Sequence, residues 1–221
     1  VWILPEKYAG RSSAEKVADI RLAMKKRRAT IHILTNLEDI VWLLNIRGGD
    51  VPCTPVVLSY LIVTRTDLMF FVNKNVLSLE VSDYLTKMGV RIFPYTDVYG
   101  IVKTFKYETV LLEKSRVNYL ILSSLDSTVN VLDTVNPTAL AKAVKNPAER
   151  ENMRMAQITD GVAMAKFIFW LKNSVKCEKL DESTAAEYLD ELRKKQEGSL
   201  GLSFETISAY GPNAAMCHYK A

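Results

Sequence analysis

Cysteine is scarce in this chain of 221 residues, and its placement excludes the small disulfide-built folds. The three cysteines, Cys53, Cys177 and Cys217, are odd in number, far apart and never spaced as Cys-x-x-Cys. This pattern argues against a disulfide framework and against a zinc knuckle. It fits a reducing compartment, and we therefore expect a cytoplasmic protein.

Long apolar runs are also absent. No run approaches the roughly 20 residues that a helix needs to cross a bilayer. The first residues, Val1 to Lys7, resemble neither a signal peptide nor a transmembrane start, and they lack an initiating methionine. We expect a protein without a membrane partner, and both of its ends look cut.

Histidine is scarcer still, with His32 and His218 the only two. They do not allow a Ser-His-Asp triad to be assembled, and neither stands at a metal-ligand spacing from carboxylates. Gly48-Gly49 lacks the spacing of a dinucleotide or phosphate-loop motif. We interpret these glycines as a turn held by an ion pair between Arg47 and Asp50. The residues alone therefore predict no metal site.

Charge of one sign does not dominate the chain. The net charge is +4 and the sequence pI is about 8.8, which is mildly basic and well short of the concentrated patch of a nucleic-acid binder. We expect no nucleic-acid partner. The longest basic run, Lys25-Lys26-Arg27-Arg28, ends a helical pattern, where cations complement the helix dipole. We interpret the run as a solvated helix end; a phosphate contact or a targeting signal is the alternative.

The first 140 residues alternate between helical and strand patterns. Ser12 or Ser13 with Glu15 forms a capping-box pattern at the start of a helix. Two β-rich runs, 58–64 and 68–73, flank a turn at 65–67 and predict a hairpin. Further strands are expected at 30–34, 90–93, 109–113 and 128–132, and further helices at 36–45, 79–88, 97–104 and 116–125. This alternation with one hairpin predicts an α/β domain whose mixed sheet is flanked by helices.

A break at 142–147 separates a second region. Asn146 can cap a helix, Pro147 suits its first position and Glu149 its third, so we expect one long helix to about residue 175. A second helix is expected over 183–197. Two strand-like runs then flank Gly211-Pro212-Asn213, three residues that favour a turn. We expect a hairpin over 203–219, part of a sheet whose other strands lie outside this chain.

The second run of that hairpin carries His218. A histidine in a β-run is more often a satisfied core or interface residue than a functional group, and from the residues alone both interpretations stay open. His32 lies inside the first strand pattern, and we expect it to be structural.

Several segments closely resemble the Xaa-Pro aminopeptidases (aminopeptidase P) of the creatinase/prolidase metallopeptidase family. Two are similar to the middle domain of the three-domain members, and the later ones to the start of the catalytic domain. In chain order they are Leu4–Gly10, Asp39–Pro52, Lys142–Glu149, Asp160–Ala163, Gly201–Ser208 and Gly211–Tyr219. The resemblance implies a creatinase/prolidase-type domain over 1–140, followed by the opening helices and hairpin of an α+β pita-bread domain over 141–221.

The resemblance also implies a function. Family enzymes remove the N-terminal residue from peptides that carry proline in second position, use two divalent metal ions, usually manganese, and are commonly homodimers. By resemblance His218 is catalytic, contacting the substrate near the reacting centre without binding metal. Arg47, Gly48 and Asp50 are family signature positions that we take as architectural, with substrate or subunit contacts as the alternative. Asn213 would fix the turn.

The chain departs from the family pattern after His218. In the family, the strands that supply two aspartate ligands follow this histidine, and the histidine and two glutamate ligands come later still. The resemblance therefore implies no metal ligand and no cofactor within this chain, and a fragment that is inactive by itself. The alternatives are a non-catalytic protein-binding module on the same fold and a prolidase- or creatinase-like enzyme.

Overall fold

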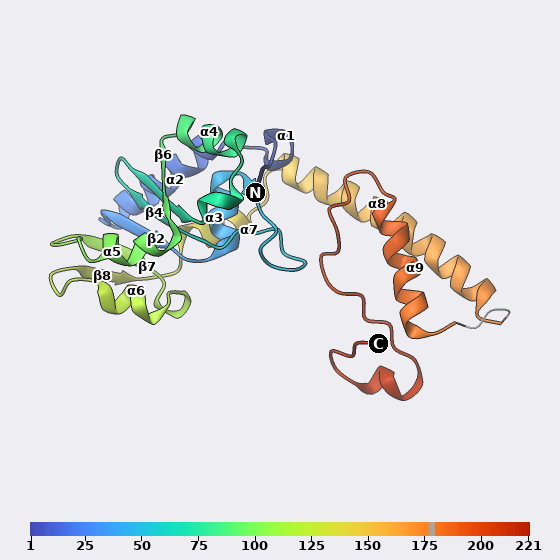
Figure 1. Cartoon of the computed structure of the whole chain (residues 1–221). Coiled ribbons are helices and arrows are strands. Elements are labelled where there is room, and N and C mark those ends of the chain that lie inside the picture. The colour runs from blue at the N-terminus through green and yellow to red at the C-terminus, as the bar shows by residue number, and fades with distance from the viewer. Residues whose placement is uncertain (177–179) are drawn as a thin grey trace. The chain divides into compact units, whose positions relative to one another are not determined.

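The computed structural model describes residues 1–176 and 180–221, which form two compact units, Val1–Glu149 and Arg150–Ala221 (Figure 1). Cys177 and part of the polar loop expected between the two C-terminal helices fall outside the described residues. Cys53 and Cys217 are free thiols. No helix in the described part of the chain is long and apolar enough to cross a membrane.

The first unit is built on a six-stranded sheet with the strand order β6-β5-β4-β2-β7-β8. Antiparallel pairing joins β4 to β2 and to β5, whereas β5–β6, β2–β7 and β7–β8 are parallel. The sheet is therefore mixed, as predicted, and the hairpin is β4–β5. The strands are β2 (Ile31–Leu34), β4 (Ser59–Thr64), β5 (Leu68–Val72), β6 (Val90–Pro94), β7 (Thr109–Leu112) and β8 (Asn130–Asp133), and a separate ribbon pairs β1 (Trp2–Ile3) with β3 (Ile46–Arg47).

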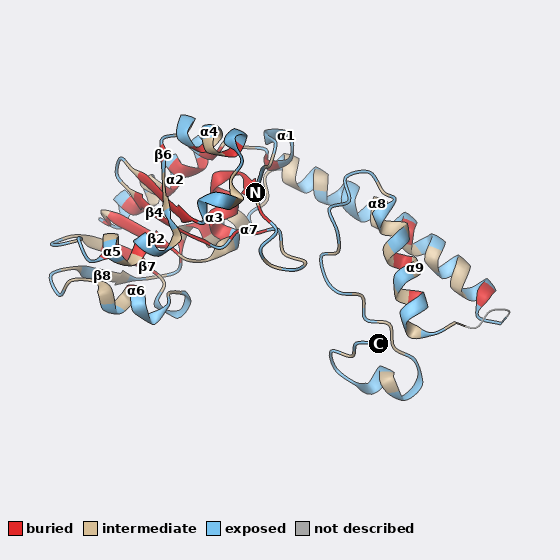
Figure 2. Ribbon diagram, in the orientation of Figure 1, coloured by how far each residue is buried: buried red, intermediate tan, exposed pale blue. Residues whose placement is uncertain are grey.

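Helices cover both faces of this sheet (Figure 2). Because side chains alternate along a strand, Leu34 packs with the helices of one face and Ile33 with those of the other. One face is covered by α2 (Ser13–Lys26), α3 (Leu37–Leu44), α4 (Leu79–Lys87) and α7 (Pro137–Ala143), and the other by α5 (Val98–Val102) and α6 (Tyr119–Ser124). The expected α/β architecture, a mixed sheet flanked by helices, is confirmed.

The helix ends follow the predicted capping chemistry. Ser12 and Glu15 form the expected capping box at the start of α2. Before α8 (Pro147–Ser174), the Asn146 amide donates to the Glu149 carboxylate at 2.9 Å and the Glu149 amide donates to the Asn146 side chain at 3.0 Å. Helix α7 was not expected, because it is only seven residues long and carries no side-chain cap bond.

The second unit consists of the rest of α8, α9 (Glu182–Lys194) and an extended C-terminal segment. The two helices agree with the prediction, but the hairpin over 203–219 is wrong, since none of these residues forms a strand. Only its turn is present, as a 3-10 segment over Gly211–Ala215. Strand ladders need backbone partners, and a two-stranded ribbon is marginal by itself. The flanking runs do not pair with each other: 205–210 carry no regular structure, and 216–218 form a bend and a turn.

His32 is a buried titratable group in the middle of this sheet. It is fully buried on β2, and its Nδ1 lies 3.0 Å from the Leu111 carbonyl oxygen. A carbonyl only accepts, so Nδ1 carries the proton and Nε2 is the bare nitrogen. Burial lowers the pKa of His32 to about 4, since a charged imidazole would lose its hydration there. The histidine is therefore a neutral structural group, as expected.

This pKa makes the first unit sensitive to acid. Between pH 6.5 and 4, His32 is protonated in the unfolded chain but stays neutral in the folded chain. Lowering the pH therefore favours the unfolded state, and the free energy of unfolding falls. His32→Asn keeps an N–H donor but cannot titrate. We expect the variant to lose about 3 kcal/mol less of its free energy of unfolding than wild type between pH 7 and pH 4. Urea unfolding at pH 7 and pH 4 measures it. Equal pH dependence in wild type and variant would contradict the assignment.

Candidate functional site

The segment that carries His218 is exposed. His218 lies just beyond the 3-10 turn, and its backbone occupies the left-handed region at φ 55°. Its ring has no hydrogen-bond partner among the residues that the structure describes. The expectation that this histidine sits in a strand is therefore wrong, while its ring is accessible to a ligand.

A hydrogen-bonded cluster fastens this segment to the start of α9. The Glu182 carboxylate accepts from the Tyr219 hydroxyl at 2.6 Å, from the Tyr210 amide at 2.5 Å and from Asn213 Nδ2 at 3.0 Å. Asn213 Nδ2 also lies 3.0 Å from the Tyr219 hydroxyl oxygen. These bonds stabilise the charged carboxylate and lower the pKa of Glu182. Asn213 therefore bridges the turn to the residue that follows His218.

We expect Glu182→Ala to loosen residues 203–221, because the cluster loses the acceptor its donors share. Hydrogen–deuterium exchange should increase over Tyr210–Tyr219 and stay unchanged in the six-stranded sheet. Wild type should show the same loosening as pH falls through the lowered pKa of Glu182, since a neutral carboxyl accepts more weakly. Glu187→Ala, which removes an exposed carboxylate from the same helix, is the matched control. Unchanged exchange in Glu182→Ala would refute the role of the cluster.

The signature residues Arg47, Gly48 and Asp50 contact backbone groups of the first unit. Arg47 Nη1 donates to the Val41 and Ile46 carbonyl oxygens at 3.2 and 2.8 Å, and burial lowers its pKa against the opposing effect of Glu149. Asp50 Oδ2 instead accepts from the Leu58 amide at 2.8 Å. The predicted Arg47–Asp50 ion pair is wrong, because each side chain ties its own end of the loop to backbone.

Gly48 is required by a close approach of two backbone segments. A Cβ at this position would lie 2.7 Å from the Val56 carbonyl oxygen, nearer than such contacts occur. The neighbouring amides complete the packing, since Gly48 N donates to the Pro55 oxygen and Asp50 N to the Val56 oxygen. The loop of the signature segment is thereby closed on itself without a charge pair.

The same segment fixes the first turn of α8 on the first unit. Trp42 Nε1 donates to Glu149 Oε1 at 3.2 Å, and Asn146 Nδ2 donates to the Ala9 carbonyl oxygen at 2.8 Å. A Cβ on Gly10 would lie 2.2 Å from Asn146 Oδ1, so the two residues meet only because position 10 is glycine. These contacts join three of the segments that carry the family resemblance.

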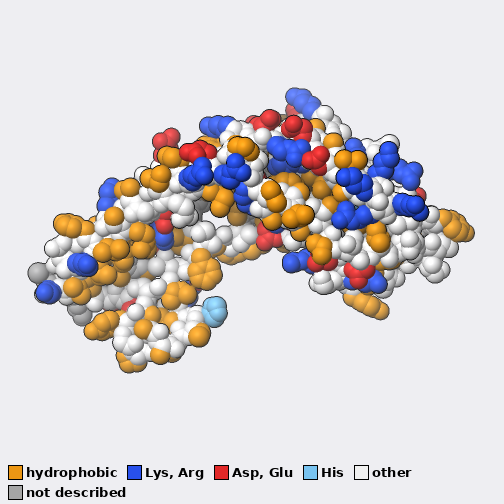
Figure 3. Space-filling model, turned by 180° about the vertical axis from the view of Figure 1, so that it is seen from behind, with side chains coloured by type: hydrophobic (Ala, Val, Ile, Leu, Met, Phe, Trp, Pro, Cys, Tyr) orange, Lys and Arg blue, Asp and Glu red, His pale blue; other side chains and the backbone are white. Residues whose placement is uncertain are grey.

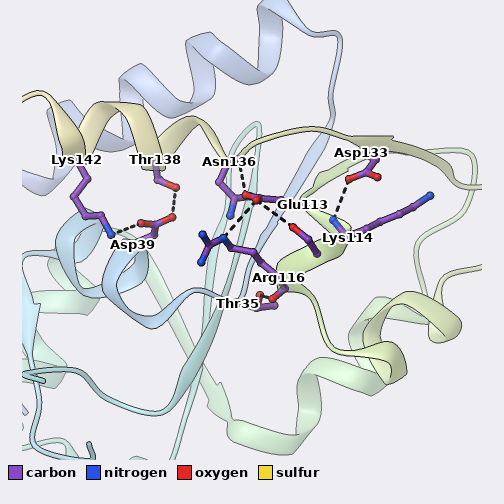
Figure 4. Close-up of polar contacts among 10 residues, drawn as sticks. Thr35, Asp39, Glu113, Lys114, Arg116, Asp133, Asn136, Thr138 and Lys142 are labelled. Atoms are coloured by element: carbon purple, nitrogen blue, oxygen red, sulfur yellow. Dashed lines mark hydrogen bonds and ion pairs between the residues drawn. The ribbon is translucent and has the colours of Figure 1, made fainter. Parts of the chain in front are cut away.

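A charged cluster lies where β2, β7 and β8 end (Figure 4). Because these strands are parallel, their carboxyl ends share one edge of the sheet, where ligands of open α/β sheets often bind. Here Asp39 is buried, with Oδ1 lying 2.7 Å from Lys142 Nζ and Oδ2 accepting from Thr138 Oγ1 at 2.9 Å. Asp39 therefore anchors α7 to α3, and its negative charge is paired with Lys142.

The second carboxylate of this edge is also engaged. Glu113 Oε1 lies 3.4 Å from Arg116 Nε, and Oε2 accepts from the Asn136 amide at 3.3 Å. A cavity of about 290 Å3 is lined by residues of both ion pairs. Asp39 and Glu113 are therefore matched to cations and connect separate elements at this edge, while Glu38 also lines the cavity. Sequence reasoning missed these connections, since Glu113 and Lys142 carried no spacing signal.

The family resemblance implies two divalent metal ions, which raises the question whether the residues of this chain could bind them. Within residues 1–176 and 180–221, no group of three or more His, Cys, Asp or Glu side chains could hold a metal ion. The carboxylates nearest the histidine segment, such as Glu182, already accept from several donors. The described residues do not fit a dinuclear site.

Comparison with known proteins covers the whole chain. The family model of the creatinase/prolidase N-terminal domain matches residues 1–149, and that of metallopeptidase family M24 matches residues 151–221. A probable Xaa-Pro aminopeptidase P of Sordaria macrospora is 36% identical over 232 residues, covering all of this chain and 38% of the relative. The corresponding protein of Botryotinia fuckeliana is also 36% identical, with 35% of its length covered. The chain thus spans little more than a third of these relatives.

Solved structures separate into near and distant matches. An X-prolyl aminopeptidase from Caenorhabditis elegans, described as a cytosolic enzyme with a di-nuclear active site, superposes with a TM-score of 0.95 at 31% identity, over 99% of this chain and 37% of that one. A prolidase from Pyrococcus horikoshii gives 0.56 at 17% identity, covering 81% of this chain and 48% of its own. The N-terminal domain of the chickpea FACT subunit SPT16 gives 0.56 at 15%, covering 82% and 50%. The last two show the fold alone.

Proposed function

Because the chain belongs to the creatinase/prolidase N-terminal domain family and continues into metallopeptidase family M24, we propose that it is part of a Xaa-Pro aminopeptidase. The observation that carries the proposal is that one aminopeptidase structure matches this chain much more closely than the other solved structures named above do. The aminopeptidase superposes over 99% of the chain at 31% identity, whereas the prolidase and the FACT subunit SPT16 share only the fold. The substrate would be a peptide with proline in second position, cleaved before that proline.

Further parts of the proposal follow from the same relatives. The full protein would use two divalent metal ions, manganese in our proposal, and would work in the cytoplasm as a homodimer, without nucleic-acid or membrane partners. Residues 1–140 would form the middle domain and 141–221 the start of the peptidase domain; the two family-model matches, which meet near residue 150, support a division close to this point.

Within this enzyme, the chain would supply a residue that contacts the substrate. His218 would contact the substrate near the reacting centre, where a hydrogen bond to developing charge favours the transition state. The proposal is supported by the exposure of His218 and by the Glu182–Asn213–Tyr219 cluster, which holds the segment on both sides of it. No metal-dependent step is assigned to these residues, because they do not fit the metal site.

Residues 1–221 alone should be inactive, because their described part groups no metal ligands. The test is a manganese-dependent assay on a Xaa-Pro peptide, with intact mass measured on the same sample. We expect no cleavage from a sample of 24.9 kDa and cleavage from the full-length protein. Activity at that mass would overturn the inactivity. A full-length protein that is inactive with manganese and with other divalent ions would favour the non-catalytic module.

In the full-length enzyme, His218→Ala should lower kcat/KM about 100-fold, the scale at which a positioned imidazole contributes. Bound metal, measured by elemental analysis, should stay unchanged, because His218 is not a ligand in our proposal. Met216→Ala, another exposed side chain of the same segment, is the control. Loss of metal in His218→Ala would contradict the substrate-contacting role.

A further inference from the structure

A basic pocket lies on the first unit, at the basic run that ends α2. It encloses about 520 Å3 and is formed by the end of α2 and the turn that joins β4 to β5. Its lining consists of Arg21, Met24, Lys25, Arg28, Ala29 and Arg65, with no acidic side chain among them. The space-filling view shows Lys and Arg side chains gathered on this unit (Figure 3).

The four cations of the basic pocket come from two separate parts of the chain and are not neutralised. Among the described residues, none of them forms an ion pair. The nearby carboxylate of Asp67 is engaged elsewhere, accepting from Thr66 Oγ1 at 2.9 Å and lying 3.8 Å from Arg91. Like charges held together repel unless an anion lies between them.

One wall of the basic pocket is fixed before any ligand arrives. Arg21 crosses from α2 to the turn, where Nε donates to the Thr64 oxygen at 3.1 Å and Nη2 to the Thr66 oxygen at 2.7 Å. Its guanidinium is therefore held in one orientation, and Nη1 makes neither of these bonds. Held donors lose less entropy when they bind an anion.

The backbone conformation of Arg28 is a further feature of the basic pocket. Helix α2 ends in a Schellman motif, with the Ala29 amide bonded to the Met24 oxygen at 2.9 Å and the Arg28 amide to the Lys25 oxygen at 3.0 Å. This motif places Arg28 at φ 57°, a left-handed position that normally belongs to glycine. The motif thereby fixes the backbone from which the Arg28 side chain lines the pocket, next to Ala29 and on the same side as Lys25 of the preceding turn.

The helix dipole accounts for only part of this arrangement. It favours Lys25 near the last carbonyls of α2, but it does not explain Arg65, which belongs to another element, or an arginine in a glycine position. The sequence had suggested a solvated helix end, and the pocket favours the alternative of a phosphate contact.

We propose that the basic pocket binds the phosphate group of a small phosphate-bearing molecule. Arg28 and Arg65 supply forked donors that match phosphate oxygens, Arg21 adds its Nη1 donors, and Lys25 adds a point charge. The buried side chains of Met24 and Ala29 line the same cavity, so an apolar part of the ligand can lie against them. The site is independent of peptide cleavage.

Pyrophosphate is the probe, titrated calorimetrically into the full-length protein at low ionic strength. We expect binding that weakens as salt rises, since the contacts are charged. Arg65→Gln should weaken it at least 10-fold. Lys103→Gln combined with Lys106→Gln removes two exposed cations elsewhere on the unit and should leave it unchanged. No binding, or equal loss in this control, would overturn the proposal.

Arg28→Gly separates a ligand-binding role from a structural one. The variant relieves the left-handed strain, so the melting temperature of the free protein should rise by about 2 °C while pyrophosphate binding falls at least 10-fold. A lower melting temperature with intact binding would contradict the proposal. Titrations with a single-stranded oligonucleotide and with anionic lipid vesicles identify the source of the phosphate. Binding to these alone, with none to pyrophosphate, would replace the small molecule by a polymer or membrane surface.

Discussion

The buried ammonium group of Lys16 is the constraint on which the first unit depends. Its side chain is 2% exposed, and Nζ donates to the Asn45 side-chain oxygen at 2.6 Å and to the Trp42 carbonyl oxygen at 3.0 Å while lying 4.4 Å from the indole centroid. Burial lowers its pKa to about 8, opposed by the Glu149 charge. A buried cation is tolerated only when acceptors surround it.

Those acceptors place several other parts of the unit. To meet Lys16, Asn45 ends α3 in the left-handed region, and its amide also donates to the Arg11 carbonyl oxygen at 2.9 Å. Trp42 must present its carbonyl and ring to the lysine, which leaves Nε1 directed at Glu149. Lys16 thus joins α2 to the end of α3, and Trp42 connects this contact to the start of α8.

Sequence reasoning succeeded where the determinants are local. The capping pairs Ser12–Glu15 and Asn146–Glu149, the hairpin turn at 65–67 and the alternating strands need only near neighbours to form. It failed where the partner is distant. Arg47 and Asp50 bond to separate backbone segments, and the hairpin around Gly211–Asn213 keeps only its turn. For the candidate site, the resemblance selected His218 and Asn213 as candidates, whereas Glu182, which bonds to their segment, carried no signal in the sequence.

The contact between Gly10 and Asn146 constrains how these two positions can evolve. Since a Cβ at position 10 would overlap the Asn146 amide, position 10 cannot gain a side chain while Asn146 is kept. The two residues lie 136 positions apart, in segments that match one family model. Lineages that acquire a side chain at position 10 must shorten position 146 or displace it, and with it the cap from which α8 starts. The pair should therefore evolve as a unit, and its covariation would record how each lineage joined these two parts of the chain.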